Sequence, residues 1–279
     1  IVHCTQVVAM SDAAIDAVRR KKDSSVTRAV DLVKSGDAEA IVSAGHTGAA
    51  VAATTVKLRT LPGIERPAIA ATLPTETNLF VLIDAGANTD PTPIQMLHNA
   101  IMGSVYSKYV LGYENPSVGL MSIGTEDKKG NTFTLESFAL LKTSGLNFRG
   151  NVEGHDLFEN PVEVVVADGF TGNVVLKTSE AVAHAVFRWL KHEIYRTPVR
   201  KLGGYLAKGA FLSIRKKTNP DEYGGSQLLG INGTCIIGHG SSSPIAVKNA
   251  IRAAIQSIKS QVNPLIVEEI KRYNEKAAA

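Results

Sequence analysis

The sequence predicts a three-layer α/β/α protein in which helices cover both faces of a doubly wound, mostly parallel sheet. Two observations support this fold class: short runs rich in β-branched residues alternate with helical patterns, and the runs are apolar almost throughout. Such runs are typical of strands buried on both faces, and their alternation with helices predicts parallel crossovers. The predicted strands are EAIVSA (39–44), FVLIDAG (80–86), SVGLMSIG (117–124), VEVVVADG (162–169) and TCIIGHG (234–240).

Helical patterns separate these strands. The chain has 279 residues, of which 44% are hydrophobic, so it can bury a sizeable core, and we expect a single α/β domain over 1–279. The predicted helices span 23–35, 47–58, 93–109, 133–144, 172–195, 243–260 and 263–276.

One segment departs from this alternation. RTPVRKLGGYLAKGAFLSIRKK (196–217) contains seven basic residues and no acidic one, with apolar residues interleaved. We expect a helical arm over 190–220 that projects from the sheet. Two interpretations stay open: a solvated hairpin or dimer contact, or a basic amphipathic element that rests on an anionic membrane surface. The residues expected to form this surface are Leu202, Leu206, Phe211, Arg215 and Lys216.

Composition argues against several function classes. The net charge of +4 is mild and no basic stripe carries interleaved aromatic residues, so we expect no nucleic-acid partner. Cys4 and Cys235 lie far apart and have neither metal-binding nor redox spacing. No stretch approaches the roughly 18 apolar residues of a membrane span, and no signal-peptide pattern is present. We therefore expect a soluble, cytoplasmic protein.

The ends of the predicted strands carry the candidate site. Each apolar run stops at a turn containing glycine, and a small polar residue then opens the next helix. In a parallel sheet such turns emerge at one edge, where N–H groups at helix N-termini favour anions such as phosphate. We therefore expect five loops to converge on a phosphate site, although capping alone also explains a Thr or Ser at any one helix start. The candidate binding residues are Gly45, His46, Thr47, Gly48, Asn88, Thr125, Asn131, Asp168, Thr171, Gly172, His239, Gly240 and Ser241.

These loops contain no obvious protein nucleophile. The sequence has no G-x-S-x-G elbow, no nucleotide fingerprint and no His/Cys cluster with metal spacing. Four residues are candidate metal ligands: Asp84, Asp90, Asp127 and Asp168. Because Asp at strand ends commonly stabilises turns, we expect no metal and no cofactor. Neutral donors beside one ammonium group, that of Lys129, suit a substrate that is itself the nucleophile. Inorganic phosphate attacking an acyl carbonyl is such a substrate.

Several longer runs resemble the PlsX family of bacterial phosphate acyltransferases. They include SAGHTGA, DAGAN, VGLMSIGTEDKKGN, VVVADGFTGNVVLKT and YGGSQLLGINGTCIIGHGSS, and the resemblance covers essentially the whole chain. It implies a homodimer with a fold similar to isocitrate dehydrogenase and phosphotransacetylase, associated peripherally with the inner face of the cell membrane. It also implies transfer of a fatty acyl chain from acyl carrier protein to inorganic phosphate, and delivery of the acyl phosphate to a membrane glycerol-phosphate acyltransferase.

The resemblance also assigns residues. Lys129 in TEDKKGN and Asn173 in DGFTGN match the family's catalytic pair, with Lys129 neutralising phosphate and Asn173 orienting phosphate or donating to the thioester oxygen. His46 stands where the family usually has Asn, and a neutral His still donates one hydrogen bond. The family's opening strand and its Asp-Ala-Met-Gly-Gly-Asp loop have no counterpart, so we expect a sheet that lacks early strands. The acidic carrier protein is expected to dock on RRKK (19–22) or on the arm.

Three other functions share parts of this pattern. A phosphotransacetylase acting on short acyl-CoA shares the fold and the chemistry, although the basic arm argues against it. A metal-dependent decarboxylating dehydrogenase needs converging Asp ligands and a nicotinamide, for which the sequence has no signal. A noncatalytic adaptor for the carrier protein or the membrane needs neither.

Overall fold

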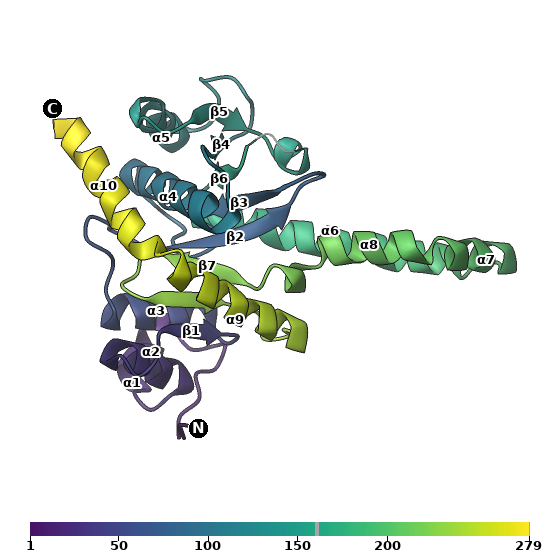
Figure 1. Ribbon diagram of the computed structural model, residues 1–279, viewed down its shortest axis with the longest axis horizontal. Helices are drawn as coiled ribbons and strands as arrows, with labels where there is room; N and C mark the ends of the chain where they lie inside the picture. The colour runs from purple at the N-terminus through teal and green to yellow at the C-terminus, as the bar shows by residue number, and fades with distance from the viewer. Residues whose placement is uncertain (160–161, 279) are drawn as a thin grey trace.

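Figure 1 shows the computed structural model of the chain, which describes residues 1–159 and 162–278. Its centre is an eight-stranded sheet with the strand order β1-β8-β7-β2-β3-β6-β4-β5. The strands are β1 (Ala40–Ser43), β2 (Ala68–Pro74), β3 (Leu79–Ile83), β4 (Val118–Met121), β5 (Phe148–Val152), β6 (Val164–Val166), β7 (Ser226–Leu229) and β8 (Thr234–Ile237). The α-helices are α1 (Ala14–Arg20), α2 (Ser25–Ser35), α3 (Thr47–Lys57), α4 (Pro93–Tyr106), α5 (Thr132–Thr143), α6 (Gly169–Ile194), α7 (Pro198–Leu206), α8 (Lys208–Thr218), α9 (Pro244–Lys259) and α10 (Val262–Ala278).

The sheet consists of two blocks whose parallel strands run in opposite directions. In one block β1 pairs in parallel with β8, and in the other β3, β6, β4 and β5 pair in parallel. Between the blocks, β8 is antiparallel to β7, β7 to β2, and β2 to β3. Three reversals leave β8 opposite in direction to β3. The predicted fold class, a mostly parallel α/β/α sheet, is confirmed, and the antiparallel strands β2 and β7 are additions to it.

Alternate residues of the strands pack against the two helical layers. Val81 and Ile83 of β3 belong to the core formed with α4, α5 and α10, whereas Phe80 and Leu82 face α6. Because successive side chains of a strand point to opposite faces, these helices form separate layers. The strands of the first block form a separate core with α2 and α3 on one face. Helix α9 packs on the other face of these strands through Ala250 and Ala254.

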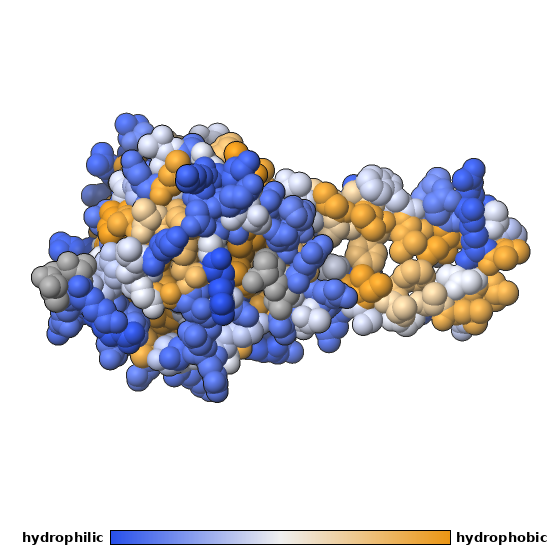
Figure 2. Space-filling model, turned by 90° about the horizontal axis from the view of Figure 1, so that it is seen from above, coloured by the Kyte–Doolittle hydropathy of each residue, from blue (hydrophilic) through white to orange (hydrophobic). Residues whose placement is uncertain are grey.

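Helix α6 extends beyond the sheet and forms a projecting arm with α7 and α8 (Figure 1). The arm turns back where Gly204 packs on Ile194, since a Cβ at residue 204 would lie 2.5 Å from the Ile194 Cγ2 atom. Apolar side chains lie uncovered along it (Figure 2), among them Leu202 and Leu206 with 62% and 77% of their surface exposed. Phe211 is only half-exposed.

Within residues 1–159 and 162–278, no helix is both long and apolar enough to cross a bilayer.

Candidate active site

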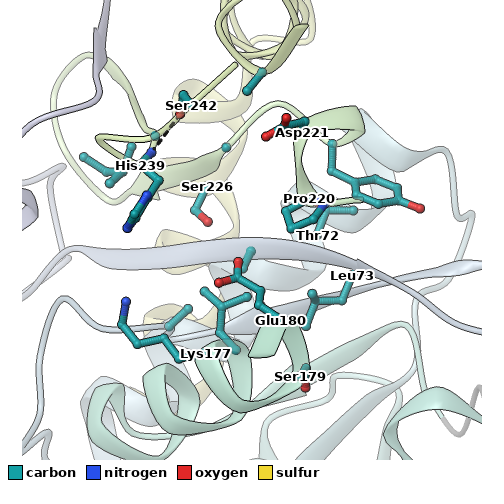
Figure 3. A pocket seen from close by; sticks show the side chains of 18 of the residues that line it. Thr72, Leu73, Lys177, Ser179, Glu180, Pro220, Asp221, Ser226, His239 and Ser242 are labelled. Carbon is teal, nitrogen blue, oxygen red and sulfur yellow. Dashed lines mark hydrogen bonds between the residues drawn. The ribbon is translucent and has the colours of Figure 1, made fainter. Parts of the chain in front are cut away.

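A cavity of about 520 Å³ lies beside the second half of β2. The cavity exists because β7 begins only at Ser226 and pairs with β2 only along Ala68–Ala70, whereas β3 pairs with β2 along Ala70–Pro74. The remaining edge of β2 faces open space. Helix α6 closes one side of this space, and the start of α9 with the segment around Pro220 closes the other (Figure 3).

Most of the cavity's wall surface is apolar, although polar and charged side chains line it at many positions. One face of α6 supplies Asn173, Lys177 and Glu180, spaced by a helical turn. The loops after β1 and β8 supply Thr47 and His239 from the other side. The apolar lining includes Ile69, Leu73, Phe158, Leu176, Ala183 and Ile237. The volume and the mostly apolar wall surface are typical of a small-molecule site.

The turn after β3 is organised around an internal anion. The carboxylate of Asp84, fully buried, accepts hydrogen bonds from the N–H groups of Ile69, Gly86, Ala87 and Asn88 at 2.7–3.1 Å. Burial raises the pKa of the Asp84 carboxyl, and these N–H donors oppose that rise. The backbone N–H groups of this turn, which were expected from the sequence to bind phosphate, therefore already bind the Asp84 carboxylate.

Helix α6 begins against this turn. The Gly169 N–H donates to the Asn88 carbonyl oxygen at 2.9 Å, and a Cβ at Gly172 would lie 1.9 Å from the Asp84 carbonyl oxygen. Only glycine permits so close an approach. Asn173 follows directly, and its side chain packs over Gly86, where an added Cβ would meet it at 3.4 Å. The Asn173 side chain thereby faces the cavity from the start of α6.

Several predicted binding residues have capping roles. Asp168 caps α6 by accepting from the N–H and the hydroxyl of Thr171 at 2.8 and 2.7 Å. Asn131 caps α5 in the same way with Thr134. The Asn88 amide donates to Gln95 at 2.9 Å. Both carboxylate oxygens of Asp168, the amide oxygen of Asn131 and the amide nitrogen of Asn88 are thus engaged within the protein.

Lys129 lies on the loop after β4, a strand that pairs with β6, and its side chain packs over Gly124 of the same loop, where an added Cβ would lie 2.7 Å from the Lys129 Cγ atom. Its side chain is half-exposed, and the ammonium group has a single ion pair within the described residues, a 4.0 Å contact with Glu126. Thr125 is exposed on the same loop. Neither Lys129 nor Thr125 lines the cavity.

The loop after β1 approaches the cavity through Ala44 and Thr47. His46 caps α3, because its Nδ1 accepts from the Ala49 N–H at 3.1 Å, while its Nε2 lies 3.2 Å from the Asp12 carbonyl oxygen. His46 thus has both ring nitrogens engaged within the protein. Gly48 lies against the His46 ring, and a Cβ at Gly45 would meet nothing within 4 Å.

The loop after β8 forms the remaining wall. His239 Nδ1 lies 2.6 Å from the Ser241 hydroxyl oxygen, and the His239 N–H donates to the Ser242 hydroxyl. His239 and Gly240 are exposed at the surface of this loop. Figure 3 shows the His239 ring directed toward Lys177 from the opposite wall.

The prediction that five loops meet at one sheet edge is wrong. The loops after β3, β4 and β6 leave one edge, and those after β1 and β8 leave the other, because the two blocks run in opposite directions. Loops from both edges nevertheless reach the cavity, since it is lined by Thr47 after β1 and by Asn173 after β6.

Sequence reasoning missed Lys177 and Glu180 as cavity residues. The signal was available in DGFTGNVVLKTSE, because residues four and seven positions after Asn173 share its helical face. The four Asp residues considered for a metal do not gather: across 1–159 and 162–278, no three His, Cys, Asp or Glu side chains could hold a metal ion together.

Comparison with known proteins shows what the chain is similar to. The family described as "Fatty acid synthesis protein" matches residues 1–265. A phosphate acyltransferase of Akkermansia muciniphila is 49% identical over 98% of this chain and 80% of its own length. Proteins with the same name from Geobacter sulfurreducens and Pelotomaculum thermopropionicum are 49% and 47% identical, over 96% and 100% of this chain and 78% and 81% of their own lengths.

Solved structures share the fold at low sequence identity. A phosphotransacetylase from Streptococcus pyogenes has a TM-score of 0.55 at 19% identity and covers 82% of this chain and 66% of its own. A branched-chain phosphotransacylase from Enterococcus faecalis has a TM-score of 0.52 at 13% identity, with coverage of 84% and 78%. The fold agrees with these enzymes, and the sequence matches place the chain in a family: it belongs to the fatty acid synthesis protein family, the PlsX family of acyltransferases.

Proposed function

We propose that the chain, as a single domain over 1–279, transfers a fatty acyl group from acyl carrier protein to inorganic phosphate. The product is an acyl phosphate for phospholipid synthesis, consumed by a membrane glycerol-phosphate acyltransferase. The observation that carries this proposal is the 47–49% identity to phosphate acyltransferases over nearly the whole chain. The carrier-protein donor and the phospholipid destination follow from the resemblance to the PlsX family.

The chemistry needs no protein nucleophile. A phosphate oxygen attacks the thioester carbonyl, the C–O bond forms as the C–S bond breaks, and the carrier thiolate takes the proton that phosphate loses. The Asn173 amide donates to the carbonyl oxygen as negative charge develops on it. Lys129 turns its exposed ammonium from Glu126 toward the phosphate as a point charge. Thr47, on the opposite wall of the cavity from Asn173, contacts the phosphate between them.

The arm and the outer face of α6 provide the surfaces that contact the membrane and a second copy of the chain. Leu202 and Leu206 rest on an anionic membrane surface, with Arg215 and Lys216 attracting its headgroups. The exposed apolar side chains of α6, such as Trp189 with 66% of its surface exposed, support a homodimer. The enzyme is thus cytoplasmic and peripheral to the inner face of the membrane, and acyl carrier protein docks on 19–22 or on the arm.

A second candidate is transfer of a short acyl group from coenzyme A to inorganic phosphate, favoured by the fold shared with the phosphotransacetylase of Streptococcus pyogenes. A noncatalytic adaptor is the third. Incubating the chain with phosphate and palmitoyl-acyl carrier protein, and trapping acyl phosphate with hydroxylamine, separates them. We expect product from the carrier-protein thioester and less than a tenth as much from acetyl-CoA. Product from acetyl-CoA alone supports the second candidate, and no product from either donor supports the adaptor.

Lys129 is tested with a neighbour as control. We expect Lys129→Ala to lower kcat at least a hundredfold, the usual scale for losing one charge-stabilising group, while Lys128→Ala keeps the wild-type rate. Circular dichroism of both variants checks the fold. Equal rates for the two variants would remove Lys129 from the mechanism.

A further inference from the structure

The cavity beside β2 has the chemistry of a site for a single-chain amphiphile with an anionic head. Its walls are apolar over most of their extent, and the cationic side chain of Lys177 enters at one end, where the His239 ring faces it (Figure 3). Within the described residues, Lys177 makes no ion pair and no side-chain hydrogen bond. Lys177 is exposed, so its ammonium reaches the cavity from the solvent side, beside apolar walls. This arrangement fits an anion that is attached to an apolar chain.

We propose that this cavity binds the fatty acyl chain of the acyl phosphate, with Lys177 contacting the phosphoryl group. This inference rests on the proposed function and adds a location and a head-group residue to it. Asn173 and Lys177 lie one helical turn apart on the same face of α6, so a carbonyl at Asn173 places its phosphoryl group within reach of Lys177.

Charged side chains on the cavity walls determine in which orientation the acyl phosphate binds. Glu180 lies one turn beyond Lys177 and turns its carboxylate into the middle of the cavity (Figure 3), where it repels an anionic head. Lys217 lines the opposite end of the cavity, but its ammonium already donates to the Glu76 carbonyl oxygen. The head therefore lies at the Lys177 and His239 end. The tail extends past Leu73 and Ala183, toward the base of the arm at Thr218. Arg215 and Lys216 of the proposed membrane surface precede Thr218 on α8, whereas α7, which carries Leu202 and Leu206, lies at the far end of the arm (Figure 1).

The first test measures chain length. Calorimetric titration of the full chain with octyl, decyl and dodecyl phosphate, below their micellar concentrations, uses stable mimics of the product. Each added methylene inside an apolar site strengthens binding about threefold to fourfold. We expect this increment in the wild type and its loss at the longest chains in Ala183→Trp, which fills the tail end. His184→Trp, an exposed neighbour outside the cavity, is the matched control.

The second test measures the head group. We expect Lys177→Gln to weaken dodecyl phosphate binding about tenfold or more, and Lys191→Gln, on the exposed part of the same helix, to leave it unchanged. Dodecanol, which lacks the phosphate, should bind both variants equally. Running all titrations in a Leu202→Ser, Leu206→Ser background removes adsorption to the arm.

Failure of this inference differs from failure of the proposed function. An identical chain-length dependence in Ala183→Trp and His184→Trp would overturn the tail site, and equal affinities of Lys177→Gln and Lys191→Gln would overturn the head-group contact. Either result leaves acyl phosphate synthesis intact in the hydroxylamine assay. Absence of synthesis in that assay, with normal dodecyl phosphate binding, would instead contradict the proposed function.

Discussion

Asp84 shows how one residue changes the meaning of a motif. The run DAGAN indicates a turn rich in backbone donors, which the sequence assigns to a bound phosphate. In the structure those donors surround the Asp84 carboxylate, so the turn is a self-contained unit that supports Asn173 through Gly86. The direction of a backbone N–H depends on the turn's geometry, which residue types alone leave undetermined.

Asp84 is therefore predicted to stabilise the folded state. Asp84→Asn keeps one acceptor oxygen but places an NH₂ group against backbone N–H donors that then lack a partner. Each unpaired buried donor costs about 1–3 kcal/mol, so we expect the free energy of unfolding in urea to fall by at least about 2 kcal/mol. Asp90→Asn, on an exposed position, should leave it unchanged. A wild-type urea midpoint for Asp84→Asn would show that these hydrogen bonds contribute little.

The buried thiol of Cys235 makes the stability of the folded chain depend on pH. Burial raises the pKa of the Cys235 thiol to about 12, so the neutral thiol is favoured in the folded state. A raised pKa contributes stability that is present below the unfolded value of roughly 8.5 and is lost as pH rises toward the folded value. At pH 8 we expect Ellman's reagent to react with one thiol per folded chain, that of Cys4, and with none in Cys4→Ser. Rapid reaction of Cys4→Ser would contradict the burial of Cys235.

At the scale of elements, α6 joins the site to the arm. Its first turn holds Asn173, its middle lines the cavity, and its end carries the arm away from the body. The periodicity of the sequence predicts this helix and its basic extension, because both are local properties. The cavity face was missed because it depends on which strands end beside α6.

The arm's exposed apolar residues give the element-scale prediction. Replacing Leu202 and Leu206 by Ser should lower the partition coefficient onto anionic phospholipid vesicles, measured by co-sedimentation, about a hundredfold or more, since each buried leucine contributes about 1.5–3 kcal/mol. Ile251→Ser with Ile255→Ser, apolar positions on α9 with 49% and 48% of their surface exposed, is the control. Added salt should weaken binding of the wild type because the arm is basic. Unchanged co-sedimentation of the arm variant would leave the arm a role in dimer contacts alone.

At the scale of the whole molecule, the sequence predicts the layers but not the strand directions. Apolar runs and helix spacing identify β1, β3, β4, β6 and β8, and hence the α/β/α class. The alanine-rich run AIAATLP and the four-residue SQLL carry weak strand signals, yet they form β2 and β7 and reverse the sheet. That reversal sends the loops to two edges and leaves the cavity between the blocks, a consequence of tertiary pairing that local patterns do not encode.

The central claim is that inorganic phosphate is itself the nucleophile toward the acyl thioester. It is tested most directly by supplying phosphate labelled with ¹⁸O at all positions and examining the acyl phosphate product by ³¹P NMR. The account predicts that the bridging oxygen between acyl carbon and phosphorus is ¹⁸O. A bridging ¹⁶O would show that a carboxylate oxygen attacked phosphorus, and would contradict the mechanism.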